Sequence, residues 1–373
     1  MKVINVVGTR PNFIKIAPIL EAMVKHPLHF EQLLVHTGQH YDQKMSKAFF
    51  DDLGMPKPDI DLHVGSGSHA EQTGRIMVEF EKVCIRERPD LVVVVGDVNS
   101  TLACTITAKK LCIDVAHVEA GLRSRDMTMP EEINRLCTDA ICDYLFTTDR
   151  MADANLLREG ASPDRIHFVG NVMIDTLFKH RELAARMRLM QEMGLQKGAF
   201  ATLTLHRPSN VDDPKVLGGI LEALAEIAKR LPIIFPVHPR TRKMIESFGF
   251  GGYLNSDGPV RGIWTTDPLG YLDFLHLNMN AKMVLTDSGG LQEETTALGV
   301  PCITLRENTE RPITCSEGTN ELVGSSKSKI LEAADKVFRR QGQTGRVPEK
   351  WDGRAAERIV EVLMAGAGIA ASR

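Results

Sequence analysis

The sequence is poor in several features that mark particular classes of protein. Aromatic residues make up only 5% of the 373 residues, which is too few for a broad base-stacking surface. The formal net charge is −3, whereas chains that bind nucleic acid usually carry a strongly basic balance. No apolar run reaches the roughly 18 residues that a transmembrane helix requires. We therefore expect no nucleic-acid partner and no membrane partner.

Cysteine patterns that would indicate a metal site or a disulfide framework are also missing. The seven cysteines are an odd number, none forms a CxxC pair, and no Cys/His cluster has zinc-site spacing. The apolar stretch Val3–Val7 is broken by Gly8 and is too short for a secretory signal core. We expect a cytoplasmic protein with reduced core cysteines, no metal site and no cofactor.

The length and the spacing of apolar runs predict two domains. A chain of 373 residues exceeds one ordinary core and suits two domains of roughly 150–200 residues. Short β-branched runs alternate with helix-like segments in both halves, which is typical of parallel sheets covered on both faces. The expected strands are 3–7, 33–36, 91–95, 115–118, 145–147, 166–169, 201–205, 233–237, 262–265, 283–286 and 302–305.

We predict an α/β fold with two Rossmann-like doubly wound domains that face a cleft. The boundary is placed near Gly170-Asn171, which gives an N-terminal domain over 1–170 and a C-terminal domain over 171–354. The segment 355–365 is amphipathic and is expected to be helical. Ligands of open parallel sheets bind at the carboxyl ends of the strands, and the unusual polar segments of this sequence follow predicted strands.

The segment HVEAGLRSRDMTMPEEINR (117–135) is the most charged of these polar stretches. It gathers three glutamates and three arginines around a short loop: Glu119, Glu131, Glu132, Arg123, Arg125 and Arg135. Glu131 and Arg135 lie four residues apart and could form an ordinary surface ion pair. That pair does not explain why the whole segment after a buried strand is charged. We expect active-site groups here, with some, such as Glu132, merely solvated.

Two further segments of the first half follow strands. Arg10 and Lys15 come after the first strand, where a tight turn at Gly8 and a helix N-terminus would suit an anion. The alternative is a plain loop with solvated cations. The segment is neither a GxGxxG motif nor a Walker loop, so a dinucleotide cradle is not supported. Asp97 follows the most apolar strand, as a site carboxylate or as a helix cap.

The second half offers a glycine-rich turn and a histidine. Ser288, Gly289 and Gly290 follow a strand and open a helix, which suits the phosphates of a ligand, although an ordinary turn would look the same. Glu294 on that helix suits a ribose diol. His206 follows the first strand of this half and is expected to face the cleft.

Two arginines and two histidines of the second half have weaker signals. Arg306 and Arg311 could support a diphosphate or the geometry of their loop. His238 and His276 are expected to be structural.

A series of segments closely resembles the non-hydrolysing UDP-N-acetylglucosamine 2-epimerases, from residue 3 to about residue 324. They are GTRPNFIKIAPI, TGQHYD, GDVNSTLA, HVEAGLRS, MPEEINR, GNVMIDTL, TLHRPSNVD, TDSGGLQEET and TERPIT. The resemblance implies the glycosyltransferase-B type of fold, in which a C-terminal helix, here about 355–373, packs back on the first domain. It also implies a homodimer.

The resemblance implies the interconversion of UDP-GlcNAc and UDP-ManNAc, in the synthesis of surface polysaccharide precursors. In this reaction the anomeric C–O bond breaks and UDP leaves, while a proton leaves C2. UDP then adds back to the 2-acetamidoglucal intermediate, with protonation of the opposite face of C2. No redox cofactor is consumed.

The matched motifs imply roles for individual residues. Asp97, Glu119 and Glu131 correspond to the acidic residues of proton transfer or of holding the intermediate, with Asp97 favoured as the C2 base. His206 corresponds to an active-site histidine near UDP. The implied substrate contacts are Arg10, Lys15 and Arg135, Leu269 and Phe274 at the uracil, Ser288, Gly289 and Gly290 at the phosphates, Glu294 at the ribose, and Arg311.

The sequence departs from the family pattern at two places. Tyr41-Asp42 stands where many members activated by UDP-GlcNAc read Arg-Glu-Met, which predicts hyperbolic kinetics. Ser209 stands where a glutamate is often seen. Both forms resemble relatives that act on modified sugars such as UDP-2,3-diacetamido-2,3-dideoxyglucuronic acid. That substrate, a hydrolysing epimerase that releases ManNAc and UDP, a glycosyltransferase and a UDP-sugar-binding module are the alternatives.

Overall fold

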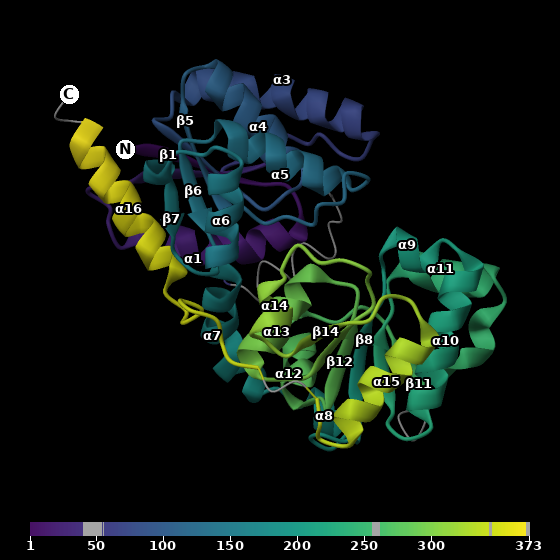
Figure 1. Cartoon of the computed structure of the whole chain (residues 1–373). Coiled ribbons are helices and arrows are strands. Elements are labelled where there is room, and N and C mark those ends of the chain that lie inside the picture. The colour runs from purple at the N-terminus through teal and green to yellow at the C-terminus, as the bar shows by residue number, and fades with distance from the viewer. Residues whose placement is uncertain (40–53, 55, 256–261, 343–344, 371–373) are drawn as a thin grey trace. The chain divides into compact units, whose positions relative to one another are not determined.

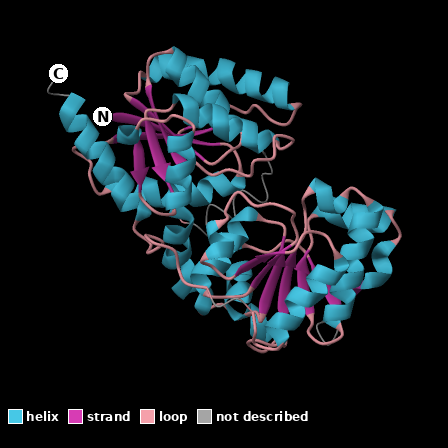
Figure 2. Ribbon diagram, in the orientation of Figure 1, coloured by secondary structure: helices cyan, strands magenta, loops and turns pink. Residues whose placement is uncertain are grey.

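The computed structural model describes residues 1–39, 54, 56–255, 262–342 and 345–370 (Figure 1). The chain divides into two compact units. Unit 1 comprises Met1–Lys179 and Glu349–Arg373, and unit 2 comprises His180–Pro348. Each unit contains a parallel seven-stranded sheet flanked by helices (Figure 2). The predicted α/β class with two doubly wound sheets is therefore confirmed.

The sheet of unit 1 has the strand order β3-β2-β1-β4-β5-β6-β7. All five residues of its central strand β4 are buried, because helices cover both faces. The strands are β1 (Lys2–Val7), β2 (Glu31–His36), β3 (Ile60–Asp61), β4 (Leu91–Val95), β5 (Asp114–Ala120), β6 (Tyr144–Thr147) and β7 (Ile166–Phe168). The helices are α1 (Arg10–Val24), α3 (His69–Glu87), α4 (Asn99–Lys110), α5 (Pro130–Ile141), α6 (Arg150–Arg158), η1 (Pro163–Arg165), α7 (Val172–Ala185) and α16 (Ala355–Ala370).

The sheet of unit 2 has the order β10-β11-β9-β8-β12-β13-β14. Its core packs the apolar face of α10 and α15 against the strands. The strands are β8 (Ala201–Thr204), β9 (Ile233–Pro236), β10 (Leu254–Asn255), β11 (Ile263–Thr266), β12 (Met283–Thr286), β13 (Cys302–Thr304) and β14 (Asn320–Leu322). The helices are α8 (Leu189–Glu192), α9 (Pro208–Val211), α10 (Pro214–Ala228), α11 (Pro239–Ser247), η2 (Phe250–Tyr253), α12 (Tyr271–Asn280), α13 (Gly289–Leu298), α14 (Ile313–Ser316) and α15 (Lys327–Phe338).

Every strand expected from the sequence is present, and three short strands were missed. The missed strands β3, β10 and β14 have two or three residues each and lie at sheet edges. Segments of this length are too short to show the apolar pattern that predicts a strand. The break between the units falls after Lys179, inside α7, and the domain boundary near Gly170-Asn171 stays a prediction.

The cysteines are all free, as expected from their spacing. The expectation that they are core residues is wrong for Cys112 and Cys137, which are exposed. Within the described residues, no helix combines the length and the apolar character that crossing a bilayer requires.

A proline in α1 provides a docking point for α7 within unit 1. Pro18 lies inside α1, and because proline has no N–H, the carbonyl of Ile14 loses its usual helical donor. The hydroxyl of Thr176, in α7, donates to this carbonyl at 2.7 Å. Asp175 accepts hydrogen bonds from the N–H groups of Ala355 and Ala356 at 3.1 and 2.7 Å. α7 therefore holds the start of α16, which packs against α1 (Figure 1).

The chain segments that leave and re-enter unit 1 touch at Gly170 and Lys350. Gly170 has a φ of +94°, and a Cβ atom on it would lie 2.1 Å from the carbonyl oxygen of Lys350. Only glycine can occupy this position without strain. The neighbouring Trp351 is buried and donates its indole N–H to the carbonyl of Thr148 at 3.0 Å.

We predict that Gly170→Ala lowers the unfolding free energy of unit 1 by more than about 2 kcal/mol, since it adds backbone strain and a clash. Urea unfolding followed by fluorescence tests this. In a Trp264→Phe background, Trp351 is the one remaining tryptophan and reports on unit 1. Gly74→Ala is the matched control, because Gly74 lies inside α3 with no atom within 4 Å of its added Cβ. A Gly170→Ala protein as stable as Gly74→Ala would contradict the prediction.

Candidate active site

Several candidate residues follow the strands at the switch point of each sheet. In unit 1, β1 and β4 are neighbours from which the strand order runs in opposite directions, and in unit 2 β8 and β12 hold that position. Open α/β sheets bind ligands beyond the carboxyl ends of such strands.

Glu119 and Lys15 form a buried ion pair in unit 1. Lys15 extends from α1 and its Nζ contacts a carboxylate oxygen of Glu119, and the two side chains are 7% and 2% exposed. Glu119 has a φ of +73°, and the pairing of β5 with β6 shifts register between Val118 and Ala120. A left-handed glutamate at a strand irregularity costs about 1–3 kcal/mol and persists only where its surroundings fix it. Such strain is characteristic of functional sites.

Asp97 is held by the buried guanidinium of Arg135. The side chain of Arg135, in α5, is 2% exposed and pairs with both Asp97 and Glu132. The carbonyl of Asp97 accepts a hydrogen bond from the Asn134 amide at 2.9 Å. The Asp97 side chain keeps 26% exposure, so one carboxylate is both anchored and accessible.

The expectation that Glu132 is merely solvated is wrong. Glu132 is 1% exposed and accepts hydrogen bonds from the N–H groups of Ser124 and Arg125 at 3.0 and 2.8 Å. Burial raises its pKa, but these bonds and Arg135 outweigh burial and hold the pKa below its ordinary value. Glu132 therefore closes the loop before α5, while the adjacent Glu131 is only half-buried.

The two other arginines of this segment have structural partners. Arg123 is buried and pairs with Asp139 at 2.7 Å and with Glu159 at 2.5 Å. Arg125 donates to the side-chain oxygen of Asn155 at 2.8 Å.

The turn after β1 is tied to β4 through Asn12. Its side-chain oxygen accepts from the N–H groups of Gly8 and Thr9 at 3.1 and 3.0 Å, and its amide donates to the Val95 carbonyl at 3.0 Å. These N–H groups already have an acceptor within the chain. Arg10, the first residue of α1, is exposed.

In unit 2, His206 pairs with a buried aspartate. Nδ1 of His206 lies 3.0 Å from Asp287, which is fully buried and also accepts from the N–H groups of His206 and Arg207 at 2.9 and 2.8 Å. Burial raises the pKa of Asp287, but His206 and these N–H groups together lower it below its ordinary value. His206 itself is half exposed, so Asp287 orients an accessible imidazole.

His238 follows β9, and it lies close enough to His206 for the two side chains to interact electrostatically. Burial lowers its pKa first, and the charges of His206 and Arg240 lower it further. His276, by contrast, is buried and contacts the carbonyl of Ala184 at 2.8 Å, which is the structural role expected.

Ser288, Gly289 and Gly290 start α13, as expected. Ser288 is half-buried at the N-cap without a side-chain capping bond. A Cβ atom on Gly289 would lie 2.5 Å from Arg311, so the guanidinium packs directly against the first turn of α13. Arg311 is buried and pairs with Glu293 and Glu310, and Arg306 also pairs with Glu310. These contacts support the geometry of the loop, and the role of the arginines at a diphosphate stays a prediction.

Glu294 is buried in α13 beside the hydroxyl of Tyr271, which donates to it at 3.4 Å. Burial raises the pKa of Glu294 to about 7, and the charge of Glu293 adds to the rise while Tyr271 opposes it. Leu269 and Phe274 do not share a cluster. Leu269 packs with residues around Phe200, and Phe274 packs with Val284, Leu291 and Val300.

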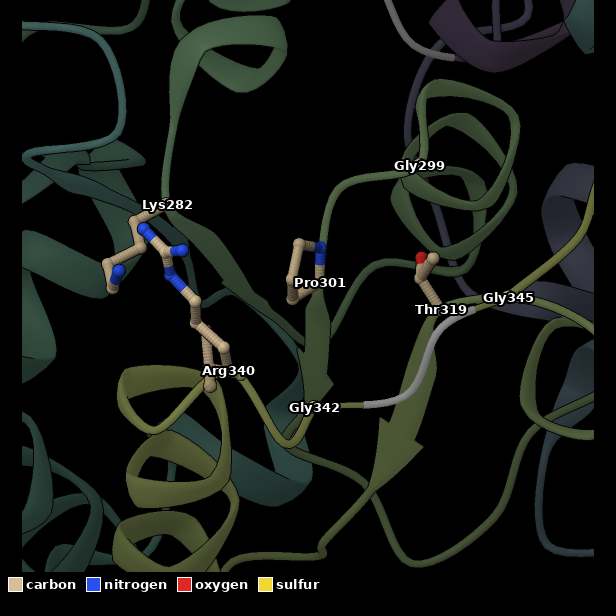
Figure 3. Close-up of a pocket in the computed structure, with 8 residues that line it drawn as sticks. Lys282, Gly299, Pro301, Thr319, Arg340, Gly342 and Gly345 are labelled. Carbon is tan, nitrogen blue, oxygen red and sulfur yellow. The ribbon is translucent and has the colours of Figure 1, made fainter.

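A cavity of about 430 Å³ in unit 2 lies away from these residues (Figure 3). Lys282, Pro301 and Thr319 line it, and they immediately precede β12, β13 and β14. The cavity is therefore at the amino-terminal edge of the sheet, opposite the candidate residues. Among the described residues, no cluster of three His, Cys, Asp or Glu side chains offers a metal site.

Comparison with known proteins decides the family. The family model described as UDP-N-acetylglucosamine 2-epimerase matches residues 21–364. The chain belongs to this family. It is accordingly an isomerase, and both the resemblance and the enzyme class predicted from the sequence are confirmed.

Relatives of the epimerase family are similar over almost the whole chain. The UDP-N-acetylglucosamine 2-epimerase of Methanocaldococcus jannaschii is 44% identical over 376 residues, which cover 98% of this chain and 100% of the relative. The UDP-2,3-diacetamido-2,3-dideoxy-D-glucuronate 2-epimerase of Pseudomonas aeruginosa is 41% identical over 373 residues, covering 97% and 99%.

A solved epimerase structure shares the fold. The crystal structure of the Methanocaldococcus jannaschii enzyme in complex with UDP-GlcNAc and UDP has a TM-score of 0.88 to this chain at 44% identity. The match covers 98% of this chain and 100% of that chain. It confirms the predicted glycosyltransferase-B type of architecture.

Several residues of this epimerase chain that support the candidate site were missed from the sequence. Asp287 follows β12 directly, as Asp97 closely follows β4, so the same strand-end signal was available. Tyr271 had no comparable signal, because its partner Glu294 lies in another segment. Tyr41-Asp42, the basis for expecting hyperbolic kinetics, lies outside the described residues.

We predict that Lys15→Met and Glu119→Gln each lower the unfolding free energy of unit 1, Lys15→Met by about 3–5 kcal/mol, because it leaves an uncompensated buried charge. The double variant is expected to be less destabilised than the sum of the single variants. Urea unfolding of the four proteins completes the cycle. Additive effects would show that the two side chains do not interact.

Proposed function

We propose that this chain interconverts UDP-GlcNAc and UDP-ManNAc by eliminating UDP to 2-acetamidoglucal and adding it back. One observation carries the proposal. Two carboxylates lie at the carboxyl ends of neighbouring strands, Asp97 just after β4 and Glu119 near the end of β5, and each is held by a buried cation, Asp97 by Arg135 and Glu119 by Lys15. Removing a weakly acidic C2 proton and returning one to the opposite face require a base and an acid in fixed positions.

The differences between the carboxylates support separate roles. Asp97 keeps 26% exposure and can reach a substrate, which favours it as the C2 base. Glu119 is 2% exposed and strained, which suits a group that holds the intermediate or acts on the other face. Glu131, half-buried in the first turn of α5, is the third candidate.

Unit 2 supplies groups suited to UDP. The turn that opens α13 offers Ser288, Gly289 and Gly290 to the phosphates, and a helix N-terminus favours negative charge. His206 can stabilise the departing diphosphate, since Asp287 orients its ring. Glu294 suits the ribose hydroxyls. Leu269 and Phe274 are proposed for the uracil, and Arg311, together with Arg10, Lys15 and Arg135 of unit 1, completes the proposed substrate set.

The second candidate is 2-epimerisation of a UDP-2,3-diacetamido-glucuronate. The 41% identity to the Pseudomonas aeruginosa enzyme favours it. The added carboxylate of a uronate requires an additional cation, so a test of both substrates separates the two candidates.

Proton NMR of UDP-GlcNAc with the protein in D₂O tests the proposal. Formation of UDP-ManNAc with deuterium at C2 is the expected result. Free ManNAc with UDP would instead identify a hydrolysing enzyme. Folded protein that gives no exchange with UDP-GlcNAc, yet exchanges C2 of the diacetamido-glucuronate, would replace the first candidate by the second.

We predict that Asp97→Asn and Glu119→Gln each reduce kcat by about 10²–10⁴-fold, the usual contribution of a positioned acid or base. If Glu131 also transfers a proton, Glu131→Gln is expected to reduce kcat to a similar extent. Rates of deuterium incorporation at C2 provide the measurement. Glu79→Gln, an exposed residue of α3, is the control and should keep wild-type activity. Near-wild-type exchange in Asp97→Asn would exclude Asp97 as the base.

We predict that UDP binds more weakly as the pH falls below about 7. The raised pKa of Glu294, about 7, means that the free protein takes up a proton there on acidification. Ribose hydroxyls donate to the ionised carboxylate and so lower its pKa in the complex. Affinity therefore rises with pH up to about 7 and then levels off. Calorimetric titration between pH 5.5 and 8.5, at about half-unit steps, measures this dependence. Glu294→Gln should remove the part near pH 7 and leave the part due to the terminal phosphate of UDP, whose pKa is about 6.

The remaining proposals rest on the family resemblance. We propose a homodimer that works in the cytoplasm on surface polysaccharide precursors, without a cofactor and with hyperbolic kinetics. Light scattering in solution tests the dimer, and initial rates over a range of substrate concentrations test the kinetics. A monomer or a sigmoidal rate curve would contradict the corresponding proposal.

A further inference from the structure

A wholly buried histidine joins the two strands that carry the candidate carboxylates. His117, in β5, is 0% exposed. Its Nε2 lies 2.8 Å from the carbonyl oxygen of Gly96, and its Nδ1 lies 2.6 Å from a carboxylate oxygen of Asp139. Gly96 immediately precedes Asp97, and Glu119 lies two residues beyond His117. The imidazole of His117, in the same strand as Glu119, thus contacts the backbone directly before Asp97.

The partners of His117 fix the orientation of its ring. A carbonyl oxygen only accepts hydrogen bonds, so Nε2 is the nitrogen that donates to Gly96. Burial raises the pKa of Asp139, but His117, Arg123 and the N–H of Gly121 together lower it below its ordinary value. Both nitrogens of the buried ring therefore have a directed partner, the Gly96 carbonyl at one end and the Asp139 carboxylate at the other.

The groups around Asp139 hold this ring in place. Asp139 is 3% exposed, accepts from the Gly121 N–H at 3.0 Å and pairs with Arg123 at 2.7 Å. Arg123 in turn pairs with Glu159. The carboxylate that contacts Nδ1 is thus itself fixed, and so are both hydrogen-bonding ends of the ring. An arrangement of this kind restricts the Gly96 carbonyl far more than packing alone would.

We propose that His117, oriented by Asp139, is a positioning residue that holds the Gly96-Asp97 turn so that the Asp97 carboxylate stays in register with Glu119. The role rests on the proposed function of these two carboxylates in proton transfer at C2. The competing interpretation is a core histidine that merely joins β5 to its neighbours.

Two amide substitutions separate these interpretations. The side-chain nitrogen of glutamine can replace Nε2, so His117→Gln keeps a donor for the Gly96 carbonyl. Asparagine is shorter and replaces Nδ1, so His117→Asn keeps the bond to Asp139 and loses the bond to Gly96. Both variants replace the ring by an uncharged amide, which makes each the control of the other.

Three readouts apply to the full-length protein. We expect His117→Asn to lose about 100-fold in kcat, the effect of a small misplacement of a reacting group, with KM for UDP-GlcNAc changed less than about threefold. Its primary deuterium isotope effect with C2-deuterated substrate is expected to increase, because proton transfer becomes slower than the other steps. His117→Gln should keep kcat within about tenfold of wild type with an unchanged isotope effect. A smaller folded fraction would lower kcat and leave the isotope effect as it is.

The third readout does not depend on turnover. The N–H of Gly96 donates to the Val118 carbonyl at 3.0 Å, so its hydrogen exchange reports the integrity of this turn. Exchange at Gly96 should be faster in His117→Asn than in His117→Gln.

The results overturn the proposal if the two variants behave alike, or if His117→Asn leaves the isotope effect and Gly96 exchange at wild-type values. Should His117→Asn fail to fold, Asp139→Ala removes the group that orients the ring and is expected to move the three readouts in the same direction. Unchanged readouts in that variant would also overturn the role. Wild-type protein that exchanges no C2 proton on either UDP-sugar would instead overturn the proposed function, and the positioning role with it.

Discussion

The buried ion pair of Lys15 and Glu119 is the interaction on which the arrangement of unit 1 depends. It joins α1 to the end of β5, and Gly96 after β4 lies between them, since a Cβ there would be 2.9 Å from the lysine Nζ. A helix, the end of a strand and the turn after another strand therefore meet at one charged contact. The cost of burying these charges is large, and it is offset only when the geometry of both partners is fixed.

The same solution recurs for the other buried charges. Arg135 bridges Asp97 and Glu132, Asp139 lies between His117 and Arg123, and Arg311 lies between Glu293 and Glu310. In each of these three groups a buried ion has a partner of opposite sign, as a low-dielectric interior requires. Charges that are fixed in this way need little reorganisation during a reaction.

Much of this organisation was predictable because it follows from local sequence. Apolar runs gave the long strands, and the residues that closely follow β1, β4, β5, β8 and β12 included nearly all candidate groups, as the switch-point rule requires. The burial of Glu132 was not predictable, because spacing along α5 suggested an exposed position, whereas the acceptor is needed by the N–H groups of Ser124 and Arg125 in a separate loop. Leu269 and Phe274 likewise pack in different clusters, which only the tertiary fold determines.

The proline in α1 helps to fix the rotation of that helix about its own axis. Hydrophobic packing alone tolerates small rotations and slides, because it is not directional. The Ile14 carbonyl, freed by Pro18 and bound by Thr176, fixes one point on the helix circumference, and Lys15 is the next residue along the chain. Inserting one residue between Lys15 and Pro18 would move the freed carbonyl from Ile14 to Lys15, and so turn the lysine side chain by about 100° relative to the bond with Thr176. The N–H that Pro18 lacks thus helps to fix where the charge of Lys15 lies in the candidate site.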